Sequence, residues 1–324
     1  MISSPLISVI IVTHRRREAL ELCLQSLLRQ KSVTELEVLV VLNGPDKASE
    51  SYLREQNVNL TALEKRLTPA GARNLASKKA KGKWLLFLDD DVTLPENYLL
   101  KALELLKNKI EILGGPDQTP PNADEFERAL GLALSSPLAT AHTHKRHHKG
   151  EKIENGNEGK FILCHLWILR EIFLQNSFDE RFFRNEENVL LHVLKEKAML
   201  YSPDLFVYHQ RKAQFSKLAP AVFSSGRHRI RSFFLYPNSF RPLYLVPLLF
   251  FFYLISLVFL THTWVLFPLV VFFVLSLFFA FKRGGFGLGP MVLSYQIFIN
   301  LSYALGTLYG IVESLLLYKK LGRH

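Results

Sequence analysis

The chain has 324 residues, and its 40 lysines and arginines outnumber its 29 aspartates and glutamates by 11. Hydrophobic residues make up 48% of the chain, which excludes a disordered protein and allows one domain of about 200 to 250 residues plus a smaller part. The two cysteines, Cys23 and Cys164, fall in an expected helix and an expected strand, which excludes a disulfide scaffold and fits a reduced, cytosolic domain.

Short apolar runs alternate with helical patterns over roughly the first 110 residues. The first run, 6–12, has seven residues and no basic segment before it, so it predicts a strand and not a signal peptide. The period indicates strands at residues 7–12, 36–42 and 84–88 and helices at residues 18–30, 70–79 and 95–107. This alternation predicts an α/β fold, a mostly parallel sheet with helices on both faces, in which ligands bind outside the carboxyl ends of the strands.

The pattern weakens after Gly114-Gly115-Pro116. Residues 117–160 are polar, and we interpret them as mobile surface loops. Their histidine-rich run, 142–148, has no cysteine or acidic neighbour, so a solvated basic loop is favoured over a metal site. Two further strands are expected at 161–169 and 205–208, with a helix at 187–197 between them.

Three consecutive aspartates, Asp89, Asp90 and Asp91, follow the apolar run at residues 84–88. Carboxylates at the end of a buried strand repel one another, so the cluster requires a compensating cation. Mg²⁺ is commonly held by one or two carboxylates together with substrate phosphates. The cluster is therefore a candidate nucleotide-diphosphate site, and a solvated turn with a helix-capping aspartate is the alternative.

Four segments, in order and spacing, resemble the family 2 glycosyltransferases with a GT-A nucleotide-sugar-binding fold. They are SVIIVTHRR at 8–16, EVLVVLNGPD at 37–46, PAGARNL at 69–75 and FLDDD at 87–91. The resemblance covers roughly residues 6–210. It implies a nucleotide-sugar donor, an acceptor and a divalent ion, Mg²⁺ or Mn²⁺.

The resemblance also implies roles for individual residues. Thr13 and Arg73 would bind the donor nucleotide, and Asp89 would approach the ribose or the sugar. Asp91 would hold the metal ion against the diphosphate, with Asp89 and Asp90 beside it. Relatives often carry Asp where this chain has Leu42 or Asn43, so Asn43 is the donor-site candidate there and a UDP-sugar is the default donor.

A second carboxylate pair, Glu186 and Glu187, resembles the family's Glu-Asp motif at a helix start. Glu187 stands where the catalytic base is expected, since inverting transfer needs a group that removes the proton of the acceptor hydroxyl. The alternative is that both glutamates only complement the helix dipole. The motif departs from the family at Val189 and Val193, which replace a common Asp and Arg.

Two further residues match positions that are functional in relatives. His209 ends the expected strand at 205–208 and is a candidate metal ligand; a hydrogen-bonding histidine is the alternative. Trp167 matches the region that shapes the acceptor pocket; a core aromatic is the alternative.

The seven lysines and arginines between residues 205 and 241 are accompanied by no acidic residue. Such a stretch suggests nucleic acid, but here it directly precedes apolar segments, where cations attract anionic lipid. We therefore expect no nucleic acid partner, and we expect Arg227, Arg229 and Arg231 to meet membrane lipid or a lipid-linked acceptor.

Residues 242–281 contain no charged side chain, which is enough for two membrane helices. Leu243–Leu260 and Trp264–Phe281, joined by Thr261-His262-Thr263, predict a hairpin with both ends on the cytosolic side. Residues 291–318 are apolar enough for a third span and contain Gly306-x-x-x-Gly310, a helix-packing signal. A third span would carry Lys319, Lys320 and Arg323 across the membrane, so a re-entrant or interfacial segment is equally open.

We therefore expect a GT-A-like domain at 1–210, a basic juxtamembrane segment at 211–241 and a transmembrane region of two to three helices at 242–324. The expected function is metal-assisted, inverting transfer of a single sugar to a glycan or lipid-linked acceptor. It would take place at the cytosolic face of a membrane, the inner membrane in a bacterium. A polyprenyl-phosphate glycosyltransferase and an inactive membrane scaffold are the alternatives.

Overall fold

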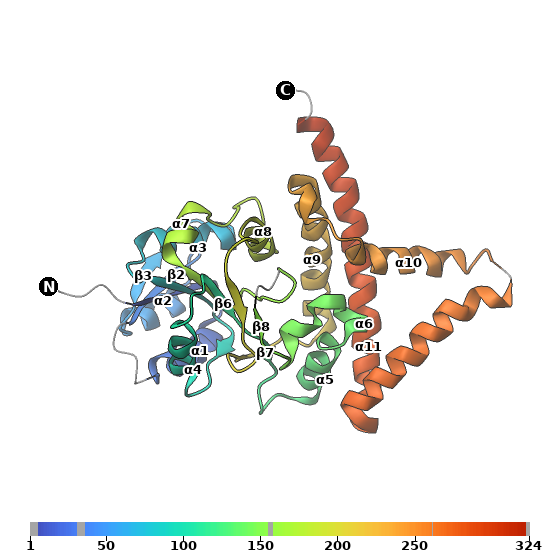
Figure 1. Ribbon diagram of the computed structural model, residues 1–324, viewed down its shortest axis with the longest axis horizontal. Coiled ribbons are helices and arrows are strands. Elements are labelled where there is room, and N and C mark those ends of the chain that lie inside the picture. Colours follow the sequence, from blue (N-terminus) through green and yellow to red (C-terminus); the bar gives the residue numbers. More distant parts are fainter. Residues whose placement is uncertain (1–5, 31–35, 155–157, 261, 322–324) are drawn as a thin grey trace. The chain divides into compact units, whose positions relative to one another are not determined.

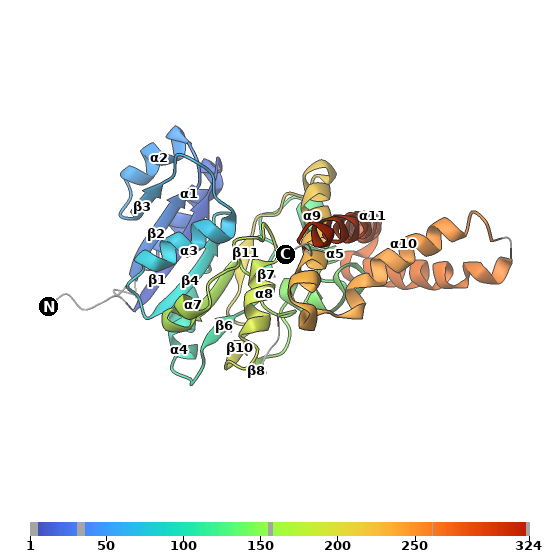
Figure 2. The same cartoon turned by 90° about the horizontal axis from the view of Figure 1, so that it is seen from above.

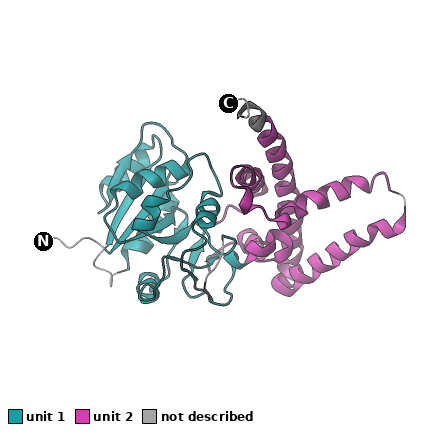
Figure 3. Cartoon of the chain, turned by 45° about the horizontal axis from the view of Figure 1, so that its top comes forward, with its two compact units in different colours: residues 1–120, 145–210 teal, residues 121–144, 211–324 magenta. Residues whose placement is uncertain are grey.

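The computed structural model describes residues 6–30, 36–154, 158–260 and 262–321; Thr261 and Arg323 lie outside the described residues. The chain forms two compact units (Figure 3). The first contains residues 1–120 and 145–210, and the second contains residues 121–144 and 211–324. The second unit starts again at Arg211, where we expect the juxtamembrane segment, and it also takes in residues 121–144. The functional division of the chain stays a prediction.

The first unit is built on an eight-stranded sheet with the order β3-β2-β1-β4-β9-β6-β10-β8 (Figures 1 and 2). Strands β3, β2, β1 and β4 are parallel, whereas β9 is antiparallel to both β4 and β6. The strand bounds are β1 Ile7–Thr13, β2 Leu36–Leu42, β3 Asn59–Ala62, β4 Trp84–Asp89, β6 Ile112–Gly114, β8 Ile153–Glu154, β9 His165–Leu169 and β10 Met199–Tyr201. The predicted α/β fold with a mostly parallel sheet is confirmed.

Helices cover both faces of this sheet, as predicted. On one face α1 and α4 bury Leu24 and Leu99 against strand residues such as Val9. On the other face α3, α7 and α8 bury Ala72, Phe173 and Leu191 against strand residues such as Phe87. Their bounds are α1 Arg17–Leu28, α2 Lys47–Arg54, α3 Pro69–Lys79, α4 Tyr98–Leu105, α7 Arg170–Gln175 and α8 Glu186–Val193. The carboxyl ends of β1, β2 and β4 then present Thr13, Asn43 and Asp89 at one edge.

A small second sheet extends this edge, with the order β5-β11-β7. It consists of β5 Val92–Thr93, β7 Asp117–Gln118 and β11 Val207–His209. His209 pairs with Val92, and Val207 pairs with Asp117. The sheet therefore brings Val92, His209 and Asp117 together, although they are far apart in the sequence.

The interpretation of residues 117–160 as loops is wrong for residues 125–134 and 137–147, which are helical; residues 155–157 lie outside the described residues. Helix α5, Glu125–Leu134, begins at Asp124, whose side chain accepts a hydrogen bond from the Glu127 amide, and it buries Ala129, Leu130 and Ala133. The residues after it form α6, Pro137–Thr140, and the 3₁₀ helix η1, Ala141–His147. Polar composition hid these elements because α5 buries small residues, which give a weak apolar signal.

The second unit contains α9, Phe215–Leu235, α10, Val246–Ser256, and α11, Phe267–Leu321. Three 3₁₀ turns, η2 Pro237–Ser239, η3 Pro242–Leu245 and η4 Thr263–Leu266, lie between them. The backbone of Gly285 leaves the helical region, with φ 59° and ψ −165°, so α11 has two helical halves. Helix α10 and the first half of α11 form the predicted hairpin, drawn in orange in Figure 1.

The second half of α11 packs along α9 through small residues. A Cβ atom on Gly306 would lie 2.0 Å from the carbonyl oxygen of Phe223, and one on Gly310 would lie 2.7 Å from that of Arg227. Such approaches exclude any side chain, so the Gly-x-x-x-Gly pair is confirmed as a helix-packing surface. Its partner is α9 of the same chain.

Candidate active site

The three aspartates at the end of β4 each contact an arginine. Arg73 of α3 donates from Nη2 to Asp89 Oδ1 at 2.8 Å. Arg16, which precedes α1, donates from Nη1 to Asp90 Oδ1 at 2.8 Å and to Asp91 Oδ2 at 2.7 Å. Two guanidinium groups thus balance part of the carboxylate charge that the sequence concentrates here.

Asp90 lies deeper in the fold than its neighbours. Its side chain is 5% exposed, and its Oδ2 accepts a hydrogen bond of 2.7 Å from the Thr13 hydroxyl at the end of β1. Burial raises the pKa of Asp90, and Asp91 adds repulsion, whereas Arg16 opposes the shift. Thr13 and Asp90 therefore form a buried polar contact between β1 and β4.

Asp91 faces His209, the last residue of β11. Asp91 Oδ1 lies 3.3 Å from His209 Nε2. Burial opposes ionisation of Asp91, but the attraction and hydrogen bond of His209, together with the charge of Arg16, lower its pKa. Carboxylate oxygens suit Mg²⁺ and Mn²⁺, and imidazole nitrogen is a common metal ligand, so the two side chains can hold the expected metal ion.

Arg73 also reaches the second carboxylate pair. Its Nη1 donates to Glu186 Oε1 at 2.7 Å, so one guanidinium joins Asp89 to the start of α8. Burial alone would lower the pKa of Arg73, but Asp89 and Glu186 raise it. Burial raises the pKa of Glu186 to about 7 against the attraction of Arg73, with repulsion from Glu187 contributing.

Glu187 has different partners. Its Oε1 accepts a 2.6 Å hydrogen bond from Asn188 Nδ2 and lies 3.6 Å from Arg146 Nη1. Arg146 donates to Asn188 Oδ1 at 2.6 Å and to the Gly159 carbonyl at 3.1 Å, which fixes the guanidinium in place. Among the described residues, these contacts address only one of the two oxygens of Glu187.

The remaining predicted donor residue, Asn43, is used by the protein itself. Its Oδ1 accepts from the Leu67 amide at 2.8 Å, and its Nδ2 donates to the Leu67 carbonyl at 3.1 Å. The amide therefore fixes the loop before α3, and base recognition by Asn43 stays a prediction.

Trp167 is fully buried in β9, and its indole nitrogen donates to the Tyr98 hydroxyl at 2.9 Å. It has no exposed surface for an acceptor, which favours the alternative of a core aromatic.

Two of the predicted lipid-facing arginines take part in helix packing within the second unit. Arg227 forms an ion pair with Glu313 of α11. Arg229 is buried and lies 4.2 Å from the centre of the Tyr244 ring. A role of these residues and of Arg231 toward lipid stays a prediction.

Sequence analysis missed four residues that the structure brings into this site: Arg16, Asp117, Arg146 and His147. Asp117 lies 2.8 Å from His209 and 2.6 Å from His147. Arg146 and His147 belong to the run interpreted as a solvated basic loop, and that interpretation is wrong for both. The side chain of Arg146 is 9% exposed and that of His147 is 13% exposed. No local spacing signals their role, because their partners lie far away in the sequence.

Comparison with known proteins identifies the family. Residues 8–177 match the model described as glycosyl transferase family 2, which is more than half of the chain. The chain belongs to glycosyl transferase family 2. Its first unit has the GT-A fold.

Two curated relatives support this assignment. An uncharacterized glycosyltransferase of Haemophilus influenzae is 30% identical over 111 residues, which cover 33% of this chain and 36% of that protein. The succinoglycan biosynthesis protein ExoO of Rhizobium meliloti is 28% identical over 103 residues, which cover 31% of this chain and 29% of that protein. The matches thus span about a third of the length of these relatives.

A solved structure resembles the family 2 chain over most of its length. The mannosyltransferase PcManGT from Pyrobaculum calidifontis, in complex with GDP-Man and Mn²⁺, matches with a TM-score of 0.64 and 14% identity. The match covers 94% of this chain and 88% of that one. At this identity the likeness shows a shared fold.

Proposed function

We propose that this enzyme transfers a sugar from a nucleotide-diphosphate donor by metal-assisted, inverting displacement. The observation that carries the proposal is the contact of Arg73 with both Asp89 and Glu186, at 2.8 and 2.7 Å. It connects the donor-side aspartates to the helix that carries the expected base. One buried cation therefore joins the aspartate cluster to Glu186, the residue next to the proposed base.

The donor side would use the residues after β1 and β4. Asp91 and His209 would hold Mg²⁺ or Mn²⁺, which supplies Lewis-acid stabilisation of the leaving diphosphate when bound. Arg16 and Arg73 balance the charge of Asp89, Asp90 and Asp91, so the carboxylates remain close together. The solved structure with GDP-Man and Mn²⁺ supports a nucleotide sugar and a divalent ion as ligands.

Glu187 would remove the proton of the acceptor hydroxyl. The acceptor oxygen forms a bond to the anomeric carbon while the bond from that carbon to the diphosphate oxygen breaks. The proton moves to Glu187, and the nucleoside diphosphate leaves with the bonding electrons. Asn188 and Arg146 fix one oxygen of Glu187, which leaves the other oriented for this transfer.

The acceptor would be a glycan or a lipid-linked precursor at a membrane surface. The name of the succinoglycan biosynthesis relative supports a role in polysaccharide formation. Among the described residues, Thr263–Leu316 is the one helix long and apolar enough to cross a membrane, and Pro242–Ser256 is a shorter apolar helix. Large apolar side chains of this hairpin are exposed, among them Val258, Phe259, Trp264 and Phe267.

We further propose that only the hairpin enters the membrane. The second half of α11 carries polar side chains that bind neighbouring helices. Gln296 donates to the Ser136 hydroxyl, Asn300 donates to the Leu138 carbonyl, and Glu313 forms an ion pair with Arg227. Crossing the hydrocarbon would carry these groups and the cations of α9 with it, which is costly. Both ends of the hairpin then lie on the cytosolic side.

A donor screen tests the proposed function. The full chain, purified in detergent, is incubated with UDP- and GDP-sugars with and without Mn²⁺, and release of the nucleotide is measured. We expect one donor class to be hydrolysed slowly, Mn²⁺ to be required, and transfer to a supplied polyprenyl phosphate or glycan to give an inverted anomeric carbon by NMR. Donor binding without turnover on any acceptor would favour the scaffold, and a retained configuration would contradict the displacement.

A further inference from the structure

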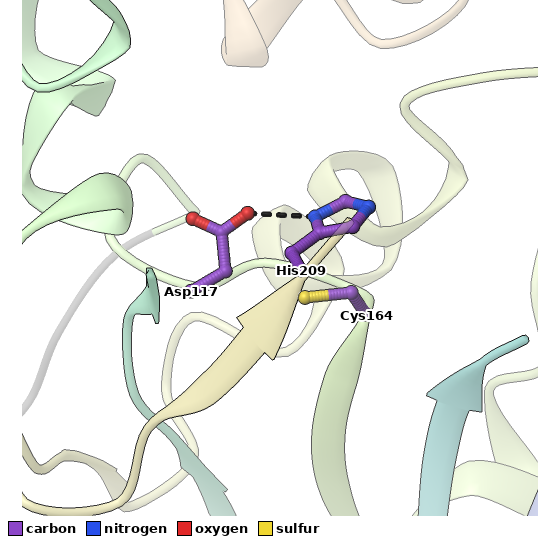
Figure 4. Close-up of side chains that lie close together, drawn as sticks. All are labelled: Asp117, Cys164 and His209. Carbon is purple, nitrogen blue, oxygen red and sulfur yellow. Dashed lines mark hydrogen bonds and ion pairs between the residues drawn. The ribbon is translucent and has the colours of Figure 1, made fainter. Parts of the chain in front are cut away.

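Asp117, which has no role in the proposed mechanism, contacts two histidines. Its Oδ2 lies 2.8 Å from His209 Nδ1, and its Oδ1 lies 2.6 Å from His147 Nδ1. The Asp117 side chain is 1% exposed. Figure 4 shows the Asp117 carboxylate directed at the ring of His209, with Cys164 below it. One carboxylate therefore joins two imidazoles, each through the nitrogen nearer the backbone.

The outward nitrogen of His209 is the one that faces the donor aspartates. His209 Nε2 lies 3.3 Å from Asp91 Oδ1, on the opposite side of the ring from Asp117. A neutral imidazole carries its proton on one nitrogen and offers the other as a ligand. When Asp117 accepts a hydrogen bond from Nδ1–H, a neutral His209 presents the lone pair of Nε2 toward Asp91.

The small sheet holds this arrangement rigidly. Asp117 starts β7, His209 ends β11, and Asp91 directly precedes β5, and the three strands are hydrogen-bonded neighbours. The amide of Gln210 donates to the carbonyl of Asp91 at 2.9 Å, which ties the end of β11 to the aspartate. His147 occupies the second oxygen of Asp117, so the carboxylate has little freedom to rotate.

We propose that Asp117, anchored by His147, is the positioning residue that orients His209 as the nitrogen ligand of the donor metal ion. This inference rests on the proposed metal-assisted function. Histidine ligands of metals commonly donate their other ring nitrogen to a carboxylate, and loss of that carboxylate typically lowers metal affinity by about 10- to 100-fold. Asp117 would act through His209 and would touch neither the metal nor the sugar.

A separate metal site is the competing use of the same residues. One ligand atom each of Asp117, Cys164 and His209 lies within 4.8 Å of the others. Such a site would need one oxygen of Asp117 as a ligand. Both oxygens of Asp117 already lie at hydrogen-bond distance from histidine nitrogens. The geometry therefore favours the orienting role.

The test measures Mn²⁺ binding directly. Mn²⁺ is titrated calorimetrically into the full chain saturated with the nucleoside diphosphate of the donor that the screen identifies. Asp117→Asn should weaken Mn²⁺ binding 10- to 100-fold, and His147→Ala should weaken it less, because it leaves the contact between Asp117 and His209 intact. Asp204→Asn, the same change at an exposed position before β11, should bind Mn²⁺ like the parent. Thermal melting of each variant establishes that it is folded.

Two further measurements separate orientation from a general structural role. Pulsed EPR of bound Mn²⁺ should show a histidine nitrogen that disappears in His209→Ala and weakens in Asp117→Asn. The double variant Asp117→Asn/His209→Ala should bind Mn²⁺ no more weakly than His209→Ala alone. Additive losses, or an unchanged nitrogen signal in Asp117→Asn, would overturn the inference.

The failure of this inference can be told from failure of the proposed function. If His209→Ala keeps the nitrogen signal and the Mn²⁺ affinity while the parent still transfers sugar, the orienting role of Asp117 is refuted and the proposed function is not. A parent enzyme that needs no divalent ion would overturn both. A tenfold loss of Mn²⁺ affinity in Cys164→Ser would overturn the inference in favour of the Asp117, Cys164 and His209 site.

Discussion

The assignment of the base makes the sharpest prediction, because two adjacent glutamates have different surroundings. In Glu187→Gln, the retained amide oxygen still accepts the 2.6 Å hydrogen bond from Asn188, and the side chain keeps its shape. The new amide cannot accept a proton. We therefore expect turnover to fall by about 10² to 10⁴, the usual contribution of a general base, which corresponds to about 3 to 5 kcal/mol in the activation barrier.

Glu186→Gln should act differently. Arg73 loses a charged acceptor at 2.7 Å but keeps Asp89 at 2.8 Å. A hydrogen bond to a charged group contributes about 1.5 to 3 kcal/mol, and part of this loss falls on the position of Asp89. We expect weaker donor binding, seen as a higher KM for the donor, with a smaller loss of kcat than in Glu187→Gln.

The assay is product formation by the detergent-purified full chain at saturating acceptor, with kcat and the donor KM measured separately for each variant. Glu196→Gln, an exposed position after α8, is the matched control and should behave like the parent. The main competitor is Glu186 itself, because its pKa of about 7 is suited to a base near neutral pH. A larger loss of kcat in Glu186→Gln than in Glu187→Gln would refute our assignment.

Four other predictions concern the metal ion, pH, helix packing and topology. Asp91→Ala should weaken Mn²⁺ binding by calorimetry at least tenfold, and unchanged binding would remove Asp91 from the metal site. Because burial raises the pKa of Glu186 from 4.5 to about 7, its stabilising effect is complete below pH 4.5 and is lost as pH rises to about 7. The melting temperature of Glu186→Gln relative to the parent should therefore rise between pH 5 and 8, and a difference that does not change with pH would contradict this. Gly306→Ala should lower the melting temperature, since its Cβ would lie 2.0 Å from the Phe223 carbonyl oxygen. Gly287→Ala, whose Cβ would meet nothing within 4 Å, should leave the melting temperature unchanged. Equal effects of the two variants would refute the packing of α11 on α9. A fluorescent protein fused to the C-terminus should report the cytosol, and a periplasmic result in a bacterial host would mean that the second half of α11 spans the membrane.

The sequence predicted the parallel half of the sheet because its strands are continuous apolar runs. Residues 36–42 and 84–88 are buried on both faces, so their pattern is local and strong. The same reasoning places ligands at the carboxyl ends of the strands, where the structure brings Thr13 to Asp90 and Arg73 to Asp89. These contacts follow from the parallel order of neighbouring strands, which a sequence pattern can indicate.

The other half of the site depends on contacts that no local pattern encodes. Asp117 and His209 are 92 residues apart, and Arg146 and Asn188 are 42 residues apart. Asp117 lies in a strand of two residues, too short to produce an alternating pattern. Arg146 and His147 lie in a polar 3₁₀ segment whose composition is typical of an exposed loop. Their burial is set by tertiary packing alone.

Arg146 and His147 are adjacent in the chain, yet they serve opposite sides of the candidate site. Arg146 contacts Asn188 and Glu187, on the side of the expected base. His147 contacts Asp117, which contacts His209 and through it the donor aspartate Asp91. Because successive Cα atoms are only about 3.8 Å apart, a displacement of either residue moves the other. The segment that composition marks as an exposed loop therefore fixes the proposed base, Glu187, relative to the proposed metal ligand, His209, as a displacement reaction would require.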